Sequence, residues 1–457
     1  MNKKLFLIFI LLSVFAQVFS CDYVIVGDIS IKGNKRTKEQ VILREFTFES
    51  GDTLSLSDFE KQLQKTRENI YNLHLFNFVE ADTFFYDSNI VNVNITVLER
   101  WYVWPIPIVE HAGRNFGAWI YEREWDRINY GIFLVVDNVR GRNETFMLKI
   151  RPGWREQYGF LYSIPALNRK KTFGLEFTFS TFRQKIFLLN TADNKPYYFI
   201  SDDYCYFQNR AITTFIYRPS LYLFHNIVLT YNDYRITDSP YSMNNDYIRS
   251  SKKNAEIVSL SYEPLLEKRN IVSFPTKGYH VGLKLQYSSD PAFKGNVNVW
   301  QFGIVSSAFL PASERFFFAT GLDAAFHTCK YESFLFDQAI GYGNYIRGYE
   351  LYTINGNAYW MQKTALNYNL VKTRVKTFGK EKYHKFLKLH YALYLSAFTD
   401  MAYVNSEYHE QTYQNQFHCG YGLGLNLVTY YDWVWRIEYS LNKYGENRVY
   451  LHFNLAF

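Results

Sequence analysis

Apolar and polar residues alternate with a period of two along most of the chain after Trp101. The clearest run is the last one, where Val449, Leu451, Phe453, Leu455 and Phe457 alternate with polar or small residues. A period of two places successive side chains on opposite faces of a β-strand. Further runs of this kind are Leu175–Phe179, Val281–Tyr287, Tyr421–Leu427 and Trp433–Leu441. The pattern therefore predicts strands of about ten residues throughout this part of the chain.

The length and the aromatic content of this region favour a membrane barrel. Alternation alone does not say which face is outside, because a soluble sandwich and a membrane barrel share it. A transmembrane strand needs about 9 to 11 residues, and barrels gather aromatic residues at both membrane interfaces. Aromatic residues make up 19% of this chain, with 40 Tyr and 40 Phe. Sixteen strands with their turns and loops would use roughly 350 residues, so residues 101–457 predict a mainly β fold, a 16-stranded antiparallel transmembrane β-barrel.

Residues 21–100 carry a mixed pattern instead. Strand-like residues at the start are followed by a short helix that ends before Gly51 and by a second helix with an apolar stripe. Thr37 is the expected cap of the first helix, and Ser57 that of the second, because Ser57 and Glu60 have the spacing of a capping box. Two strands around Ser88 then form a hairpin. The order β-α-α-β-β predicts one small α+β domain before the barrel.

The first residues predict export from the cytoplasm. Lys3 and Lys4 precede an apolar run from Leu5 to Phe15, which is too short to span a bilayer of about 20 helical residues. Residues 1–20 therefore indicate a signal peptide that is cleaved before Cys21. Lipid attachment to Cys21 is the alternative, and Phe19 suits it poorly.

Composition and motifs exclude several other classes of protein. The net charge is +7, but no cluster of Lys and Arg is dense enough to follow a phosphate backbone, so no nucleic-acid partner is expected. The mean hydropathy of −0.24 excludes a bundle of membrane helices. No hydrolase, metalloprotease or nucleotide-binding motif occurs, and neither the ten His nor the scattered Cys have the spacing of metal ligands. We therefore expect no enzyme activity, no cofactor and no metal.

Several motifs, in their order, resemble the superfamily of outer-membrane barrels that contains BamA and the two-partner-secretion transporters. Residues 29–34, 71–79 and 97–100 are similar to the start, middle and end of a POTRA domain. Residues 343–349, with Arg347, Gly348 and Tyr349, look like the motif at the tip of the sixth extracellular loop. Residues 137–143, 275–279 and 398–400 also agree. The resemblance implies a POTRA-like domain over 21–100 and a barrel over 101–457.

The resemblance also implies a role for the loop motif. The family's partner for the arginine lies where Asp400 stands, and a guanidinium inside a lumen is costly unless a carboxylate meets it. Pairing of Arg347 with Asp400 would hold the loop in the lumen, and Gly348 would let the backbone pass close to the wall. A solvated Arg347 on an outer loop is the alternative. Ala402 replaces the glycine that the family often has, which puts a close backbone approach at that position in doubt.

Two further features concern the ends of the barrel. Phe453, Leu455 and the terminal Phe457 resemble the C-terminal signal that assembly machinery reads. Pro105 and Pro107 lie in the first predicted strand, and because proline lacks an N–H they would weaken the seam where the first and last strands meet. Alternatively, the two prolines would lie in the linker between the domains, if the first strand of the barrel began after them.

These features predict a protein that assists the insertion of other outer-membrane proteins and captures them through the free sheet edge of the POTRA-like domain. The expected location is the outer membrane, with this domain in the periplasm. The expected partners are unfolded outer-membrane or secreted polypeptides, membrane lipid and accessory periplasmic or lipoprotein subunits. A two-partner secretion transporter and a passive pore or structural barrel are the alternatives.

Overall fold

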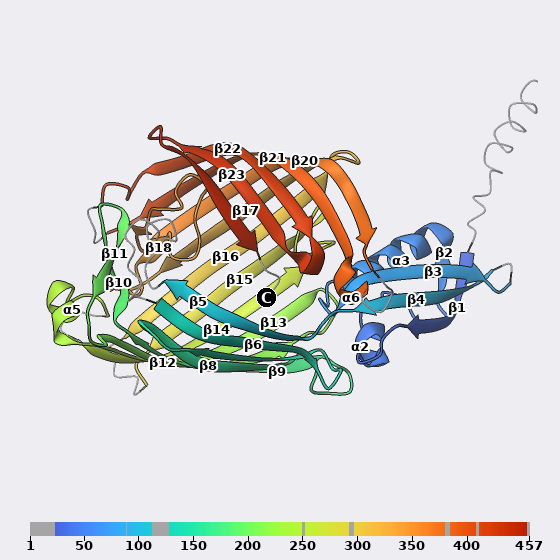
Figure 1. The fold of residues 1–457 in the computed structure, drawn as a ribbon, viewed down its shortest axis with the longest axis horizontal. Coiled ribbons are helices and arrows are strands. Elements are labelled where there is room, and N and C mark those ends of the chain that lie inside the picture. The colour runs from blue at the N-terminus through green and yellow to red at the C-terminus, as the bar shows by residue number, and fades with distance from the viewer. Residues whose placement is uncertain are drawn as a thin grey trace, which may run out of the picture.

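A computed structural model describes residues 23–87, 89–111, 128–248, 252–291, 297–379, 384–407 and 411–454. The predicted signal peptide, Cys21, Leu455 and Phe457 lie outside these residues. The molecule is elongated, with a small α+β domain at one end of a large curled sheet (Figure 1). In the described ranges no helix has the length and apolar character needed to cross a membrane.

The N-terminal domain is a four-stranded sheet covered by two helices. Its strands are β1 (Tyr23–Lys32), β2 (Thr53–Ser55), β3 (Phe76–Phe85) and β4 (Ile90–Glu99), and its helices are α2 (Glu39–Leu43) and α3 (Leu56–Tyr71). The sheet order is β2-β1-β4-β3, with β1 parallel to β4. Sequence reasoning missed β2, because three residues are too few to show a period. The prediction of one small α+β domain is confirmed.

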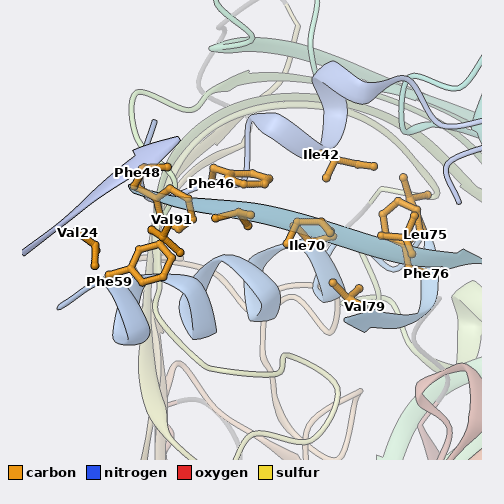
Figure 2. Close-up of a cluster of buried hydrophobic side chains, with 14 of the residues drawn as sticks. Val24, Ile42, Phe46, Phe48, Phe59, Ile70, Leu75, Phe76, Val79 and Val91 are labelled. Atoms are coloured by element: carbon orange, nitrogen blue, oxygen red, sulfur yellow. The ribbon is translucent and has the colours of Figure 1, made fainter. Parts of the chain in front are cut away.

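The core of this domain lies between the sheet and the helices. Val24 and Val91 from the sheet meet Phe59 and Ile70 from α3, and all four are at least nine-tenths buried (Figure 2). Removing this much apolar surface from water is the main force that holds the small domain together.

Both predicted helix caps are wrong. Ser55, rather than Ser57, is the N-cap of α3, and its hydroxyl accepts a hydrogen bond from the Asp58 amide at 3.1 Å. The short strand β2 ends at Ser55, so the helix begins two residues earlier than the capping-box spacing suggested. Thr37 does not cap α2 either, because its hydroxyl donates to the buried carboxylate of Glu99 at 2.7 Å.

The rest of the chain forms one antiparallel sheet of 16 strands, as predicted. Its strands, in chain order, are β5 (Val103–His111), β6 (Ile128–Val139), β7 (Glu144–Arg151), β8 (Arg155–Ile164), β9 (Phe173–Gln184), β12 (Tyr206–Tyr217), β13 (Leu223–Ile236), β14 (Asn254–Glu267), β15 (Gly278–Ser289), β16 (Asn298–Pro311), β17 (Phe316–His327), β20 (Ala358–Thr377), β21 (Lys388–Asn405), β22 (Phe417–Thr429), β23 (Val434–Asn442) and β24 (Asn447–Asn454). Each strand pairs with the next in this list, and β5 and β24 are the two edges. The sheet curls (Figure 1), but within the described ranges no ladder joins β24 to β5, so it is not closed.

The alternation along the strands places apolar side chains outside and polar ones inside. On β21, Leu395 and Met401 are exposed, while Ser396 and Asp400 between them are buried. This is the inverse of a water-soluble sheet protein, and it is the arrangement of a barrel whose outer face meets lipid. The exposed apolar residues on β22 to β24 are Phe417, Tyr421, Leu423, Leu425, Leu427, Trp435, Ile437, Tyr439, Val449, Leu451 and Phe453.

Smaller elements cover the two ends of the curled sheet. A hairpin of β10 (Ile186–Ala192) and β11 (Lys195–Ile200), helix α5 (Asp238–Met243) and the strand pair β18 (Gln338–Ile340) and β19 (Ile354–Asn355) are at one end. The N-terminal domain, α6 (His384–Leu387) and the 3-10 turn η2 (Tyr430–Asp432) are at the opposite end (Figure 1).

Candidate functional site

The connection between β17 and β20 reaches the inner face of the sheet at Arg347. The guanidinium of Arg347 donates to both carboxylate oxygens of Asp400 on β21, with Nε–Oδ2 at 2.9 Å and Nη2–Oδ1 at 2.6 Å. The Arg347 amide also donates to Asp400 Oδ2, at 3.0 Å. The exposed fractions of the two side chains are 12% and 0%. The structure thus brings together the two residues that the sequence placed far apart.

Other groups of the wall surround the same guanidinium. Glu438 on β23 lies 3.6 Å from Arg347 Nη1 and is itself buried. The ring of Phe398 on β21 lies under the guanidinium, 3.9 Å from its centroid to Cζ. An aromatic face and two carboxylates both favour the charged form of arginine, so the position is built for a cation.

The backbone of the loop also lies close to the wall. A Cβ on Gly420 of β22 would lie 1.7 Å from the Arg347 carbonyl oxygen, which leaves no room for any side chain. Gly348 has a φ of +91°, and its carbonyl accepts a hydrogen bond from Asn442 at 3.2 Å. The close approach therefore occurs at Gly420 and Gly348, and the alanine at position 402 does not hinder it.

Tyr349 and Ala402 belong to one fully buried cluster between the loop and the wall. The ring of Tyr349 contacts the rings of Tyr352, His418 and Tyr444 at centroid distances between 5.2 and 6.3 Å. This packing holds the chain directly after the arginine.

The outer part of the same loop is held by the β10–β11 hairpin. The amide of Thr353 donates to the Asn194 carbonyl at 2.9 Å, and the Thr191 hydroxyl meets that of Thr353 at 3.0 Å. Phe334 packs on Tyr247 and belongs to a buried cluster with Phe187 of the hairpin. The loop is thus covered on the side away from the N-terminal domain.

At the opposite end the N-terminal domain is anchored by a second buried Arg–Asp pair. Arg100, directly after β4, donates to Asp432 in η2, and the exposed fractions of the two side chains are 6% and 2%. Tyr71 and His74 contact the same carboxylate at 2.7 and 3.0 Å. Burial by itself raises the pKa of Asp432, but the hydrogen bond from His74 and the charges of Arg100 and His74 outweigh it and hold that pKa well below its usual range.

The domain also contacts turns between other strands. Arg218, between β12 and β13, donates two hydrogen bonds of 2.8 Å to Glu45. Asn72 pairs with Asn270 and Val272, between β14 and β15, at 2.9 and 3.0 Å. Contacts on several turns give the domain one defined position over this end of the sheet.

A cavity of about 380 Å³ lies beside Arg347. Arg347, Lys363 and Glu438 line one part of it, and Val272 and Phe274, next to the docked domain, line another. The space inside the curled sheet is therefore bounded by the loop on one side and lies close to the domain on the other.

Pro105 and Pro107 lie in the edge strand β5, opposite Leu134 and Ile132 of β6. The ladder to β6 runs without interruption over the whole of β5. Proline has no N–H to donate, and within sheets it is confined largely to edge strands. Both prolines lie on the edge strand β5. Phe453 lies on the outer face of the other edge strand, β24, and is half-exposed.

Sequence reasoning missed Glu438, Gly420 and Asp432. The alternating pattern does place Glu438 on the polar face of a strand, but it does not show which residue Glu438 contacts. Gly420 and Asp432 contact residues that are distant in the sequence, and a local pattern does not reveal such contacts.

Comparison with known proteins gives a family for both parts of the chain. Residues 138–430 match the family described as "Omp85 superfamily domain", and residues 24–100 match "Surface antigen variable number repeat" (POTRA). The fold is similar to that of BamA from Haemophilus ducreyi lacking POTRA domains 1–3, with 14% identity over 94% of this chain and 84% of that one and a TM-score of 0.50. CdiB from Escherichia coli has 13% identity over 94% and 75% of the two chains and a TM-score of 0.52. No curated protein matches the sequence.

We expect Asp400→Asn to release the loop, because Arg347 would keep its buried charge and lose the carboxylate to which it donates two hydrogen bonds. Removing one partner of a buried pair costs about 3 to 5 kcal/mol, which would appear as faster hydrogen exchange at the amides of residues 341–352. Asp233→Asn is the matched control, since Asp233 pairs with the half-exposed Arg235 and such pairs contribute about 0 to 1 kcal/mol. Equal loop exchange in wild type and Asp400→Asn would show that the pair does not hold the loop.

A substitution at Gly420 tests the close backbone approach separately from the Arg347–Asp400 ion pair. Gly420→Ala places a methyl group on the Arg347 carbonyl and should release the loop without removing a charge. Gly303→Ala on β16 is its control, because a Cβ there meets nothing closer than 3.5 Å.

We expect the docking of the N-terminal domain to withstand mild acid. A carboxyl with a depressed pKa stabilises the docked state above its usual pKa of 3.8, and that stability is lost as pH falls through the lower folded value. Spin labels at the exposed Lys61 and Glu314 would report one narrow distance distribution at about pH 7 and about pH 5, and a broad one in strong acid.

The Asp432→Asn variant should broaden this distance distribution at neutral pH, and Asp82→Asn, on an exposed part of β3, should not. A narrow distribution in Asp432→Asn would contradict this role of Asp432.

Proposed function

The chain belongs to the Omp85 superfamily, and from this premise we propose that it assists the insertion of other proteins into the bacterial outer membrane. The family and the BamA-like fold support an outer-membrane assembly or secretion transporter. The observation that favours insertion is the seam between β24 and β5, which no ladder closes in the described ranges, and whose edge strand β5 contains two prolines. The proposed location is the outer membrane, with the N-terminal domain in the periplasm after removal of the signal peptide.

The proposed site of client capture is the free edge of β3 in the N-terminal domain. Within the described residues this strand pairs with β4 on one side only, so its other side offers unpaired backbone groups to an extended chain. Phe84, Phe85 and Tyr86 at its far end are exposed by 54%, 56% and 78%. Exposed aromatic residues beside a free edge are suited to an unfolded, apolar polypeptide. A domain that only packs on the barrel would have no use for them.

The seam is the proposed route into the membrane. In a closed barrel of this topology β24 would pair with β5, and Pro105 and Pro107 would withhold two of the donors that β5 could supply. A weak seam lets a client strand add to an edge and leave sideways into lipid. The exposed apolar face of β24, which includes Leu451 and Phe453, is suited to remain in contact with that lipid.

The loop motif is proposed to keep the pore closed while a client leaves through the seam. Arg347, Gly348, Tyr349 and Asp400 form a clasp that holds the loop against the inner wall. A client that leaves sideways does not need the pore, so a closed lumen and an active seam are compatible. A passive pore would instead conduct ions freely, and the clasp and the docked domain both oppose that.

Secretion of a dedicated polypeptide is the second candidate function. The fold resembles CdiB as closely as BamA, so the fold itself does not separate the two. Secretion requires the loop and the domain to leave the lumen, whereas insertion requires the seam to open. The proposed partners in either case are unfolded polypeptides, membrane lipid and accessory periplasmic or lipoprotein subunits. The proposal includes no catalytic step, no cofactor and no nucleic acid.

We expect Pro105→Val combined with Pro107→Val to slow insertion. The double variant restores two backbone donors at the seam, each worth about 0.5 to 1.5 kcal/mol, which corresponds to a rate about fivefold to a hundredfold lower if the seam must open. The assay uses the purified chain in outer-membrane lipid vesicles and follows the folding of a urea-denatured eight-stranded barrel by its heat-modifiable mobility. Pro196→Val in the remote strand β11 is the matched control.

The outcomes separate the candidate functions. An unchanged insertion rate in the double variant, with the wild type active, would contradict the seam as the route. Transport of an unfolded polypeptide into the vesicle interior without insertion would favour secretion. Vesicles that gain only ion permeability would favour the passive pore.

A further inference from the structure

Three side chains from separate elements converge beside the clasp. Glu350 comes from the loop, Glu438 from β23 and His452 from the edge strand β24. One ligand atom from each lies within 4.8 Å of the other two. His452 Nε2 is 3.3 Å from Glu438 Oε2 and 3.8 Å from Glu350 Oε1.

Each residue is held through one atom, and its other atom faces the shared space. Glu350 Oε2 accepts a hydrogen bond from the Gly348 amide at 2.9 Å, and Glu438 Oε1 faces Arg347. His452 Nδ1 contacts the Tyr345 hydroxyl at 3.1 Å, and the two rings stack at 5.3 Å. In the part of the chain that the structure describes, Glu350 Oε1, Glu438 Oε2 and His452 Nε2 are buried and make no hydrogen bond.

Buried polar atoms without partners cost free energy, so three that point to one place need a common explanation. The exposed fractions of the Glu350 and Glu438 side chains are only 8% and 2%. Water does not readily compensate such groups. A cation bound between them would satisfy all three at once.

We propose that Glu350, Glu438 and His452 bind a divalent transition-metal ion of the Zn²⁺ class. Ligands of a tetrahedral zinc ion, at bond lengths of about 2.0 to 2.2 Å, lie about 3.3 Å apart. The separations of 3.8 and 3.3 Å between His452 Nε2 and the two carboxylate oxygens differ little from this. One imidazole and two carboxylates are a ligand set that zinc accepts, with water in the fourth position. Tyr345 serves as the outer-shell partner that orients His452 through Nδ1.

The alternative occupant of the space is a proton. A protonated His452 would form ion pairs with Glu438 and Glu350 and would satisfy the same atoms. Arg347 and Arg436 lie nearby and disfavour a further positive charge, whether proton or metal. The carboxylates of Glu350 and Glu438 and the neighbouring Asp400 offset these charges.

The bound ion would connect the loop to the edge of the sheet. Glu350 follows the Arg347–Gly348–Tyr349 motif directly, and His452 lies on the strand that borders the seam. The site thus joins the loop clasp and the seam. This inference goes beyond the proposed function and does not depend on it.

The test is metal binding to the purified, tag-free full chain after treatment with a chelator. We expect one Co²⁺ ion to bind with the visible ligand-field bands of a tetrahedral site, and Zn²⁺ to displace it. Glu350→Gln should lower the Zn²⁺ affinity measured by calorimetry by at least about tenfold. Glu350 lies in the loop, so this variant should keep the heat-modifiable mobility of the folded barrel, which guards against a trivial loss of structure. His452→Gln should behave in the same way.

His225→Gln is the matched control, because His225 lies on β13 and contacts the side chains of Tyr262 and Tyr217 rather than carboxylates. It should bind Zn²⁺ as the wild type does. Equal Zn²⁺ affinity in wild type, Glu350→Gln and His452→Gln would overturn the proposal. Absence of Zn²⁺ and Co²⁺ binding to the folded wild type would overturn it as well and would favour the protonated histidine.

Discussion

A buried guanidinium inside the curled sheet is the constraint on which the arrangement depends. Arg347 lies where water is largely excluded, and an unpaired charge there would cost several kcal/mol. Asp400 compensates it with two hydrogen bonds, and Glu438 and the ring of Phe398 complete the surroundings. This geometry requires a glycine at position 420 and fixes the loop between the strands β20 to β23.

The same kind of interaction, a buried Arg–Asp pair, occurs at the other end of the sheet. Arg100 and Asp432 form a second buried pair, and it attaches the N-terminal domain to a turn between two of the same C-terminal strands, β22 and β23. Strand β23 therefore lies between the clasp and the domain anchor. Buried ion pairs add little net stability but strongly disfavour other arrangements, because any displacement leaves a charge unpaired. The two pairs thus define one conformation, with the loop inside the curled sheet and the N-terminal domain docked. The proposed function requires that the loop, the domain or the seam can move.

The fold followed from the sequence to a large extent, and the site followed in part. Period-two alternation predicted the sheet, because the outer face of each strand meets lipid and the inner face meets polar groups, as Leu395 and Asp400 show. The loop motif pointed to Arg347 and Asp400 only through resemblance to a family. The strand β2 and the true cap Ser55 were missed because both depend on a three-residue pairing. Asp432 and the Glu350–Glu438–His452 cluster were missed for another reason. A local pattern indicates which face a residue lies on, but which residue of a distant element meets it depends on register and loop path.

The central claim is that the loop, held by Arg347 and Asp400, closes the lumen. Planar-bilayer conductance of the purified chain, compared with a variant that lacks residues 331–357, tests it most directly. The account predicts a low, flickering current in the wild type that becomes large and steady in the deletion variant. Equal, steady currents in both would contradict it, because the loop would then be an exposed connection outside an open pore.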